Sequence, residues 1–503
     1  MRGCVHSMPV TFGEFYKKFG FDEYPFSVFT SENEQDKGEK LFIDTSMYSP
    51  IIEGFASGAT MLLAGDRGTG KTAIIYDFCR KASKETLIVN ISDFSDLKEQ
   101  FDTKDLYRFV IARFCEQLFK SIAEDKKNGS ALTNEQKILL SYFLTYFVKQ
   151  TTKNELQRKI KALQTGLFWR IAGFFYGLFR TPLNVGANAT NTFLSNLISQ
   201  SMGVANQDPK WAEYFPELTG DVDQTFSDPE FSFSMLVKAV KLAKAIGYLR
   251  ITLIFDRIDE YNRLDNAADQ IANFIQPLAT DNRFLIDQEF QVVVSLWVIP
   301  FNLLKDRVRT QKIFCPSVNW NNADLVSACN RRISVYSKNN IEIFYNMFSG
   351  DVAETALTEL LILCNKNPRD LWHLMDKVFR AQYAINSDFD KLTSEAIAKG
   401  INDFVCQFNF YEYYPRKSNS KSNSMDIYGY IRHLLKLPDV EFTRNQLNER
   451  AGTGSSTQNY VAAMESIGLV ERTGTTGGNI LYKIRDPKVV HALRRGLDIT
   501  RSA

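Results

Sequence analysis

Histidine is rare in this 503-residue chain and cysteine is scattered, which narrows the metal chemistry available to it. Only four histidines are present, and no two stand at the spacing of metal ligands. The seven cysteines include no C-x-x-C pair, so we expect neither a disulfide framework nor a structural zinc site. A metal held by protein side chains alone is therefore not expected, and the cysteine pattern favours a reducing, cytoplasmic environment.

The chain also has little excess charge and no long apolar run. Its 60 basic and 58 acidic side chains give a net charge of +2, so any binding to nucleic acid would need a local basic patch. The apolar stretch 167–179 is only about 13 residues long and contains Arg170, whereas a membrane span needs roughly 20 apolar residues. We interpret it as a buried or partner-facing helix and expect no membrane contact. Residues 1–10 lack the apolar core of a signal peptide.

One glycine-rich segment has a specific meaning. The run Met61–Ala64 has the length of a buried strand, the sequence GDRGTGKT follows it, and the next ten residues have a helical pattern. This segment matches the phosphate-binding pattern G-x-x-x-x-G-K-[ST] in full, because glycines let the backbone curl and expose its N–H groups to phosphate. The residues expected to contact the nucleotide, ATP or possibly GTP, are Gly65, Asp66, Arg67, Gly68, Thr69, Gly70, Lys71, Thr72 and Ala73.

Two of these residues have distinct chemical roles. We expect Lys71 to reach the β- and γ-phosphates, and the Thr72 hydroxyl to bind Mg²⁺. A second segment completes the predicted metal site: the apolar strand 250–255 ends in the sequence DRIDE. Because the carboxyl end of such a strand lies near the phosphates, Asp256 is the expected partner of Mg²⁺. Asp259 or Glu260 would polarise the attacking water, and the spacing leaves both open.

These motifs carry a resemblance to known families. GDRGTGKT, the strand ending in DRIDE, and NPRDLWHLM at 367–375 resemble the STAND and AAA+ branches of the P-loop ATPases. The nearest likeness is to bacterial STAND ATPases, several of them encoded beside phage-defence genes. Initiator-type AAA+ ATPases of the origin-recognition class are also similar. The likeness covers about residues 20–410 as architecture, but only the P-loop and the acidic strand are specific.

The resemblance implies further roles by position. Arg369 matches the arginine that reaches from a helical lid to the γ-phosphate, so it joins Lys71, Asp259 and Glu260 as a predicted catalytic residue. Ser295, late in the strand 290–297, takes the place of a polar sensor residue. Arg307 and Arg309 are candidates for an arginine supplied to a neighbouring subunit, although ordinary exposed basic residues are the favoured explanation. The segment 24–26 is expected beside the adenine.

The last 79 residues have the pattern of a winged helix. Predicted helices at 425–437, 443–450 and 455–467 precede two strands joined by a glycine-rich tip, which is typical of that fold. Residues 411–503 carry 14 Lys or Arg against 9 Asp or Glu, but the presumed recognition helix opens with SSTQN and has no cation. Arg472 and Lys483 on the wing are the candidate phosphate contacts. DNA binding and docking onto protein both remain open.

Together these patterns predict an α/β protein with several domains. We expect a P-loop ATPase core at 1–310 of the AAA+ or STAND type, with a helical insertion at 128–225, a helical lid at 311–410, a polar linker at 411–424 and a winged helix at 425–503. The predicted function is an ATP-hydrolysing switch that requires Mg²⁺. It would couple its nucleotide state to homo-oligomer assembly or to a partner protein, with phage defence implied by resemblance alone. The alternative is an ATP-dependent DNA-binding initiator or regulator.

Overall fold

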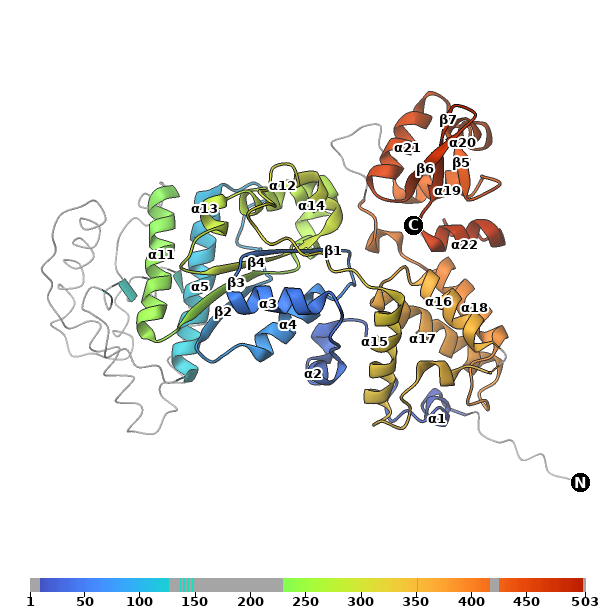
Figure 1. Ribbon diagram of the computed structural model, residues 1–503, viewed down its shortest axis with the longest axis horizontal. Coiled ribbons are helices and arrows are strands. Elements are labelled where there is room, and N and C mark those ends of the chain that lie inside the picture. The colour runs from blue at the N-terminus through green and yellow to red at the C-terminus, as the bar shows by residue number, and fades with distance from the viewer. Residues whose placement is uncertain are drawn as a thin grey trace, which may run out of the picture.

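The computed structural model describes residues 10–125, 229–350, 352–416 and 425–500, and also the six residues Gln136, Leu139, Leu140, Phe143, Phe147 and Val148 (Figure 1). The predicted insertion at 128–225 falls almost entirely outside this set, as does the apolar stretch 167–179. The second half of the predicted linker, 417–424, also lies outside it. Within the described residues, no helix is both long and apolar enough to span a membrane.

A parallel sheet forms the centre of the first half of the molecule. Its strands lie in the order β1-β4-β3-β2, and β1, β3 and β4 form at the apolar runs where the sequence predicts strands. β1 and β4 are buried along their whole length, as expected for parallel strands covered on both faces. The bounds are β1 Met61–Gly65, β2 Thr86–Ile91, β3 Arg250–Phe255 and β4 Gln291–Trp297.

A short extended segment lengthens the sheet beyond β1. The N–H groups of Leu62 and Ala64 donate to the carbonyls of Phe314 and Pro316 at 2.9 and 3.0 Å, and Val318 donates back to Ala64 at 2.8 Å. These bridges are parallel, so the segment acts as a fifth strand at that edge. The result is an α/β fold around a parallel sheet, with the strand after the glycine loop at the far edge of the sheet.

Helices cover both faces of this sheet because its side chains alternate between them. Met61, Leu63, Ile254 and Val293 point to one face. That face is covered by α3 (Tyr48–Ser57) and α4 (Lys71–Lys81) (Figure 1). The neighbouring strand residues point to the opposite face. The helices there are α5 (Thr103–Asp125), α11 (Pro229–Ile246), α12 (Ala268–Ala279), α13 (Asn282–Leu285) and α14 (Val298–Leu304).

A helical lid follows the sheet in the chain. It comprises α15 (Asn322–Tyr336), α16 (Ala353–Leu363), α17 (Pro368–Ile385) and α18 (Ser394–Cys406). α17 begins sharply because the Asn367 side chain accepts the N–H groups of Arg369 and Asp370, and Pro368 has the backbone angle of a first helical residue.

The N-terminal segment packs into the lid although it precedes β1 in the chain. It contains α1 (Phe12–Lys18), which is closed by a capping box between Thr11 and Glu14. The aromatic residues of this segment surround Phe379 of α17 with ring centroids within 6.2 Å. They are Phe15, Phe19, Phe21, Tyr24 and Phe26. Burial of these large rings anchors the segment and fixes where the chain enters the region of the P-loop.

The C-terminal unit is a winged helix, as the sequence predicts. Thr443 forms a capping box with Gln446 at the start of its second helix, and Gly477 and Gly478 make the wing turn at positive φ. The unit also contains a third short strand and a final helix, which the sequence patterns do not predict. The elements are α19 (Ile427–Leu434), β5 (Glu441–Thr443), α20 (Arg444–Ala451), α21 (Thr457–Ser466), β6 (Val470–Thr476), β7 (Asn479–Ile484) and α22 (Pro487–Arg495).

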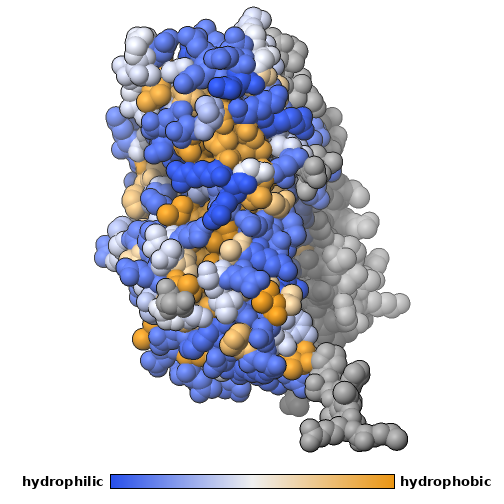
Figure 2. Space-filling model, turned by 90° about the vertical axis from the view of Figure 1, so that its right-hand side faces the viewer, coloured by the Kyte–Doolittle hydropathy of each residue, from blue (hydrophilic) through white to orange (hydrophobic). Residues whose placement is uncertain are grey.

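The winged helix is fixed to the lid by a buried contact. α22 packs against α16 and α18, and one hydrophobic cluster runs through both units. Inside this contact Lys488 lies 3.1 Å from Asp370 of α17, and both side chains are buried. Figure 2 shows the outer face of the two units, where apolar side chains form separate patches among hydrophilic ones.

Candidate nucleotide-binding site

The predicted glycine loop connects β1 to α4 and has the geometry of an anion site. Gly68 and Gly70 have φ angles of 79° and 90°, which other residues adopt rarely, and Gly70 caps the N-terminus of α4. The loop therefore presents backbone N–H groups together with the positive end of a helix. Gly68 is also required by the lid, because a Cβ atom there would lie 2.7 Å from the Asn367 side chain.

Lys71 lies inside the loop. Its Nζ atom donates to the carbonyls of Gly65 and Asp66 at 2.9 and 2.8 Å, and the side chain is buried. Burial lowers the pKa of Lys71, while the carboxylates of Asp259 and Asp256 oppose that shift. Gly65 and Asp66 do not line the cavity, whereas the loop residues from Arg67 to Ala73 all do.

Thr72 and Asp256 meet although they are far apart in the sequence. The Thr72 hydroxyl donates to Asp256 Oδ2 at 2.9 Å. The other carboxylate oxygen of Asp256 is buried and has no hydrogen-bond donor among the described residues, and burial raises the pKa of this carboxyl group. A hydroxyl and an under-satisfied carboxylate are the ligands that Mg²⁺ prefers. The described residues contain no cluster of three His, Cys, Asp or Glu, so the remaining ligands would be water and phosphate oxygens.

The two acidic residues that the sequence could not separate have different surroundings. Asp259 forms a salt bridge with Arg67, with its Oδ2 atom 2.6 Å from Arg67 Nε. Glu260 lines the cavity, is exposed, and forms no salt bridge within the described part of the chain. Although its side chain is open to solvent, the surrounding protein removes part of its hydration, and this desolvation together with repulsion from Asp259 raises the pKa of Glu260. Glu260 is thus the more available acceptor of a proton.

The backbone turns sharply at Arg257, within this acidic segment. This residue follows Asp256 directly and has a φ of 58°, in the left-handed region. A non-glycine residue in this region turns the chain sharply, and the short helix Ile258–Glu260 follows it. The turn places Asp256, Asp259 and Glu260 on the same cavity.

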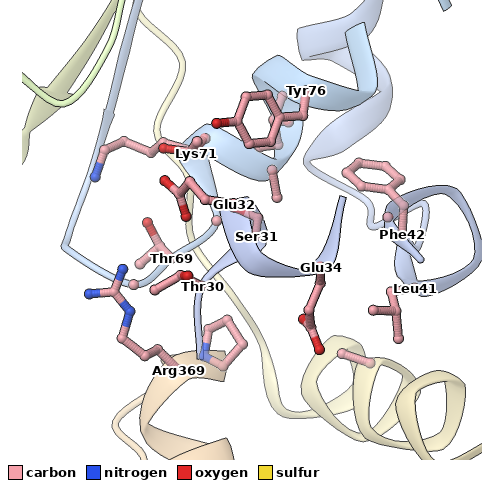
Figure 3. A pocket seen from close by; sticks show the side chains of 18 of the residues that line it. Thr30, Ser31, Glu32, Glu34, Leu41, Phe42, Thr69, Lys71, Tyr76 and Arg369 are labelled. Carbon is pink, nitrogen blue, oxygen red and sulfur yellow. The ribbon is translucent and has the colours of Figure 1, made fainter. Parts of the chain in front are cut away.

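Arg369 and Ser295 also line this cavity. Ser295 lies on β4, between the strand that precedes the glycine loop and the strand that precedes Asp256. Figure 3 shows Arg369 of α17 and Lys71 of α4 entering the same space, with Thr69 and Thr30 between them in this view. Arg369 Nη1 lies 3.7 Å from Glu412, too far for a strong ion pair.

Arg307 and Arg309 lie outside this cavity. Both side chains are exposed after α14, and Arg307 donates to the Gln276 side chain at 2.7 Å. The structure therefore does not bring them to the phosphate end of this subunit's own site.

At the end of the cavity away from the phosphate-binding loop, the predicted contact between segment 24–26 and the adenine is wrong. Tyr24 and Phe26 do not line it: the Tyr24 hydroxyl donates to Asp376 and Phe26 is fully buried in the lid. The N-terminal segment instead contributes residues somewhat later in the chain, around α2 (Gly38–Leu41), to a cavity of about 210 Å³. These are Phe29, Thr30, Ser31, Glu32, Glu34, Leu41, Phe42 and Ile43, which no motif marks in the sequence.

Two further contacts to the glycine loop were not predicted. Asn367 Nδ2 donates to the carbonyl of Arg67 at 2.6 Å, and Trp320 Nε1 donates to the carbonyl of Thr69 at 2.8 Å. The lid therefore holds the loop directly. The position of Asn367 just before Pro368 marks it as a helix cap, but nothing in the sequence indicates that its amide group also reaches the loop.

Some solved structures resemble this chain at low sequence identity. No protein-family model and no curated protein sequence match the chain. Among solved structures it is similar to the ORC2 protein of Aeropyrum pernix, in its ADPNP–ADP complexes (TM-score 0.36, 10% identity, 97% of this chain and 98% of that chain) and in its ADP form (0.33, 10%, 97% and 98%). It is also similar to a Walker-type ATPase of Pyrococcus abyssi (0.38, 13%, 93% and 96%). At these values the fold assignment rests on the sheet order and the loop of this chain.

Proposed function

We propose that the chain binds ATP with Mg²⁺ at the glycine loop and hydrolyses it. The observation that carries the proposal is the meeting of Thr72 and Asp256 in front of the loop, with one Asp256 oxygen buried and unsatisfied. A cation between these oxygens and the phosphates would balance the buried carboxylate, which is costly to leave uncompensated. Lys71 supplies a second positive charge inside the loop.

The proposed chemistry is mainly electrostatic positioning. The loop N–H groups and Lys71 bind the phosphates, while Thr72 and Asp256 hold the metal, which would neutralise charge on the phosphate oxygens. Glu260 takes the proton of the attacking water, because Asp259 is already paired with Arg67. Arg369 reaches from the lid toward the last phosphate and so distinguishes ATP from ADP.

We further propose that ATP serves as a switch for the attached units. The lid contacts the loop through Asn367, and the winged helix is fixed to the lid through Lys488 and Asp370. A change at the phosphates therefore has a continuous path to the winged helix. The output is assembly or binding of a partner protein.

A DNA-binding regulator is the second candidate function, and the charges of the winged helix disfavour it. α21, the presumed recognition helix, has no lysine or arginine, and Arg472 on the wing is paired with Glu465 at 2.7 Å. A phage-defence role rests only on the resemblance of the P-loop and the acidic strand to bacterial STAND ATPases. No further observation on this chain favours it.

Phosphate release from ATP tests the proposal directly. The wild-type protein should release phosphate with Mg²⁺ and stop when the metal is chelated. Asp256→Asn should lose most of this activity because the amide cannot balance a divalent cation. Asp306→Asn, which changes an exposed aspartate outside the cavity, is the matched control and should behave as wild type. Metal-independent release, or full activity in Asp256→Asn, would contradict the proposed site.

A further inference from the structure

Arg67 stands at a position that the glycine-loop pattern leaves open to any residue, and its side chain binds groups outside the loop. Its Nε and Nη2 atoms both lie 2.6 Å from Asp259, from Oδ2 and the backbone carbonyl respectively. Its Nη1 atom donates to the Asn266 side chain and, at 3.4 Å, to the carbonyl of Tyr411. The guanidinium also stacks over Trp297 at 4.2 Å. All three nitrogens are therefore used, and they join the loop to two distant parts of the chain.

Asn266 continues this contact to the segment that leads into the winged helix. Its Nδ2 atom donates to the carbonyl of Tyr411 at 2.8 Å, and its own carbonyl accepts the N–H of Arg416 at 3.1 Å. Arg416 also forms a salt bridge with Asp265 at 3.2 Å. We call residues 411–416 the connector, because they join the lid to the residues before the winged helix. The loop after the acidic segment thus holds the connector at both its ends.

The connector is also held from the winged-helix side. Tyr413 and Tyr414 are buried, and the Tyr414 hydroxyl donates to Asp486 at the start of α22 at 2.9 Å. Asp66, the loop residue before Arg67, is within electrostatic range of Arg485 of the winged helix, which opposes the rise in the Asp66 pKa that burial causes. The connector is therefore bound to Arg67 on one side and to the winged helix on the other.

We propose that Arg67 is a positioning residue that couples the phosphate loop to the connector, and so to the winged helix. This inference rests on the proposed function, because it needs a phosphate ligand at the loop. In the structure Lys71 Nζ is bound to the carbonyls of Gly65 and Asp66, next to Arg67. Phosphate oxygens compete for the same ammonium group, so binding changes the loop beside Arg67 and hence its hold on Asn266 and Tyr411.

Hydrogen exchange at the connector measures this coupling, because the Arg416 N–H is bonded to the Asn266 carbonyl. In the full-length protein, exchange in the peptide containing residues 411–416 should differ between the ligand-free and the ATP·Mg²⁺ states. Arg67→Ala should speed exchange there about tenfold without ligand, since it removes charge-assisted hydrogen bonds. Arg67→Lys should not restore protection, because a lysine cannot reach Asp259, Asn266 and Tyr411 at once.

Asn266→Ala separates the coupling from nucleotide binding, since Asn266 does not line the cavity. It should keep ATP affinity by calorimetry but lose the ATP-dependent change at 411–416. Asn262→Ala, an exposed asparagine in the same loop, is the control and should keep both. The proposed coupling is contradicted if the wild type binds ATP and hydrogen exchange at 411–416 does not change. It is also contradicted if Asn266→Ala keeps the ATP-dependent change in exchange. In both cases the proposed function stands. If the wild type binds no ATP, the proposed function is wrong and the coupling falls with it.

Discussion

At the scale of single residues, the pairing of Asp259 with Arg67 is what separates two adjacent acids. The carboxylate of Asp259 is occupied by the Arg67 guanidinium, 2.6 Å away, so it is less available to an attacking water. Glu260, one residue further on, has no such partner in the described chain, and its pKa is raised. General bases work best when their pKa approaches the operating pH. The local charges therefore assign different tasks to neighbouring carboxylates.

Because the surroundings of the two acids differ, substituting each of them should have a different effect on turnover. Glu260→Gln should retain ATP binding and lower turnover by roughly 10²–10⁴-fold, the usual contribution of a general base. Asp259→Asn should reduce turnover less and should also loosen Arg67, because an amide does not balance the guanidinium. Single-turnover phosphate release measures both rates. A larger loss in Asp259→Asn than in Glu260→Gln would reverse the assignment.

The residue scale also shows what the sequence can and cannot predict about the site. The motifs identify Lys71, Thr72 and Asp256 because each has a fixed place beside a strand or a glycine turn. Which of Asp259 and Glu260 is the better candidate base depends on the contact of Asp259 with Arg67. Arg67 is distant in the chain, so no local sequence pattern indicates this contact. The residues at the far end of the cavity are similarly hidden, because the packing of the N-terminal segment on the lid decides which of them face inward.

At the scale of elements, the lid helix α17 presents two adjacent residues to different units. Arg369 lines the cavity, and Asp370 is buried against Lys488 of the winged helix. The N-terminus of α17 is held in place by Asn367, which caps the helix and also binds the glycine loop. The glycine loop and the start of α17 are therefore in direct contact.

Arg369→Ala tests the first of these two roles. It should weaken the binding of ATP by about tenfold or more and leave ADP affinity nearly unchanged, because only the terminal phosphate would lie within its reach. Titrations of ATP and ADP by calorimetry give the two affinities. Equal weakening of both nucleotides would mean that Arg369 supports the fold of the lid and does not sense the γ-phosphate.

Lys488→Met tests the second role. The two carboxylates of Asp486 and Asp370 outweigh burial and raise the pKa of Lys488, so the ammonium is charged inside the contact. Removing it leaves Asp370 buried without a partner, which typically costs about 3–5 kcal/mol of unfolding free energy. Urea denaturation should show this loss, whereas Arg494→Met on the exposed side of α22 should change stability by about 0.5 kcal/mol or less. Similar losses in both variants would argue against a buried ion pair at this junction.

The elements that the sequence predicts well share a physical origin. The four strands are nearly continuous apolar runs, and such runs have few alternatives to a buried parallel sheet. The helices and wing of residues 425–503 follow from caps and glycine turns that act locally. β5 has only three residues and exists because Phe442 pairs with Tyr482 of β7, a long-range contact that local patterns do not contain.

At the scale of the whole molecule, the glycine loop lies where the core, the lid and the connector meet. Asn367 and Trp320 bind it from the lid side, and Arg67 extends from it to the connector. The winged helix is joined to the same region through Tyr414 and Lys488. An arrangement in which one loop contacts the core, the lid and the connector suits a protein whose ligand controls the relative positions of these units.

Salt-dependent binding separates the two candidate outputs of the winged helix. A DNA-binding surface would lose affinity by roughly one power of salt concentration for each phosphate contacted. We expect no such binding of a DNA duplex at micromolar concentration by the full-length protein, because α21 lacks cations and Arg472 is paired with Glu465. Fluorescence anisotropy across a salt series measures this. Tight, salt-sensitive binding that is lost in the double variant Arg472→Ala with Lys483→Ala would favour the DNA-binding regulator.

The central claim is that the glycine loop binds ATP with Mg²⁺, and calorimetric titration tests it most directly. The wild-type protein should bind ATP·Mg²⁺ with one site per chain. Lys71→Ala should lose that binding, because no other ammonium group lies inside the loop to pair with the phosphates. Lys84→Ala, an exposed lysine after α4, should bind as the wild type does. Unchanged ATP affinity in Lys71→Ala would contradict the account.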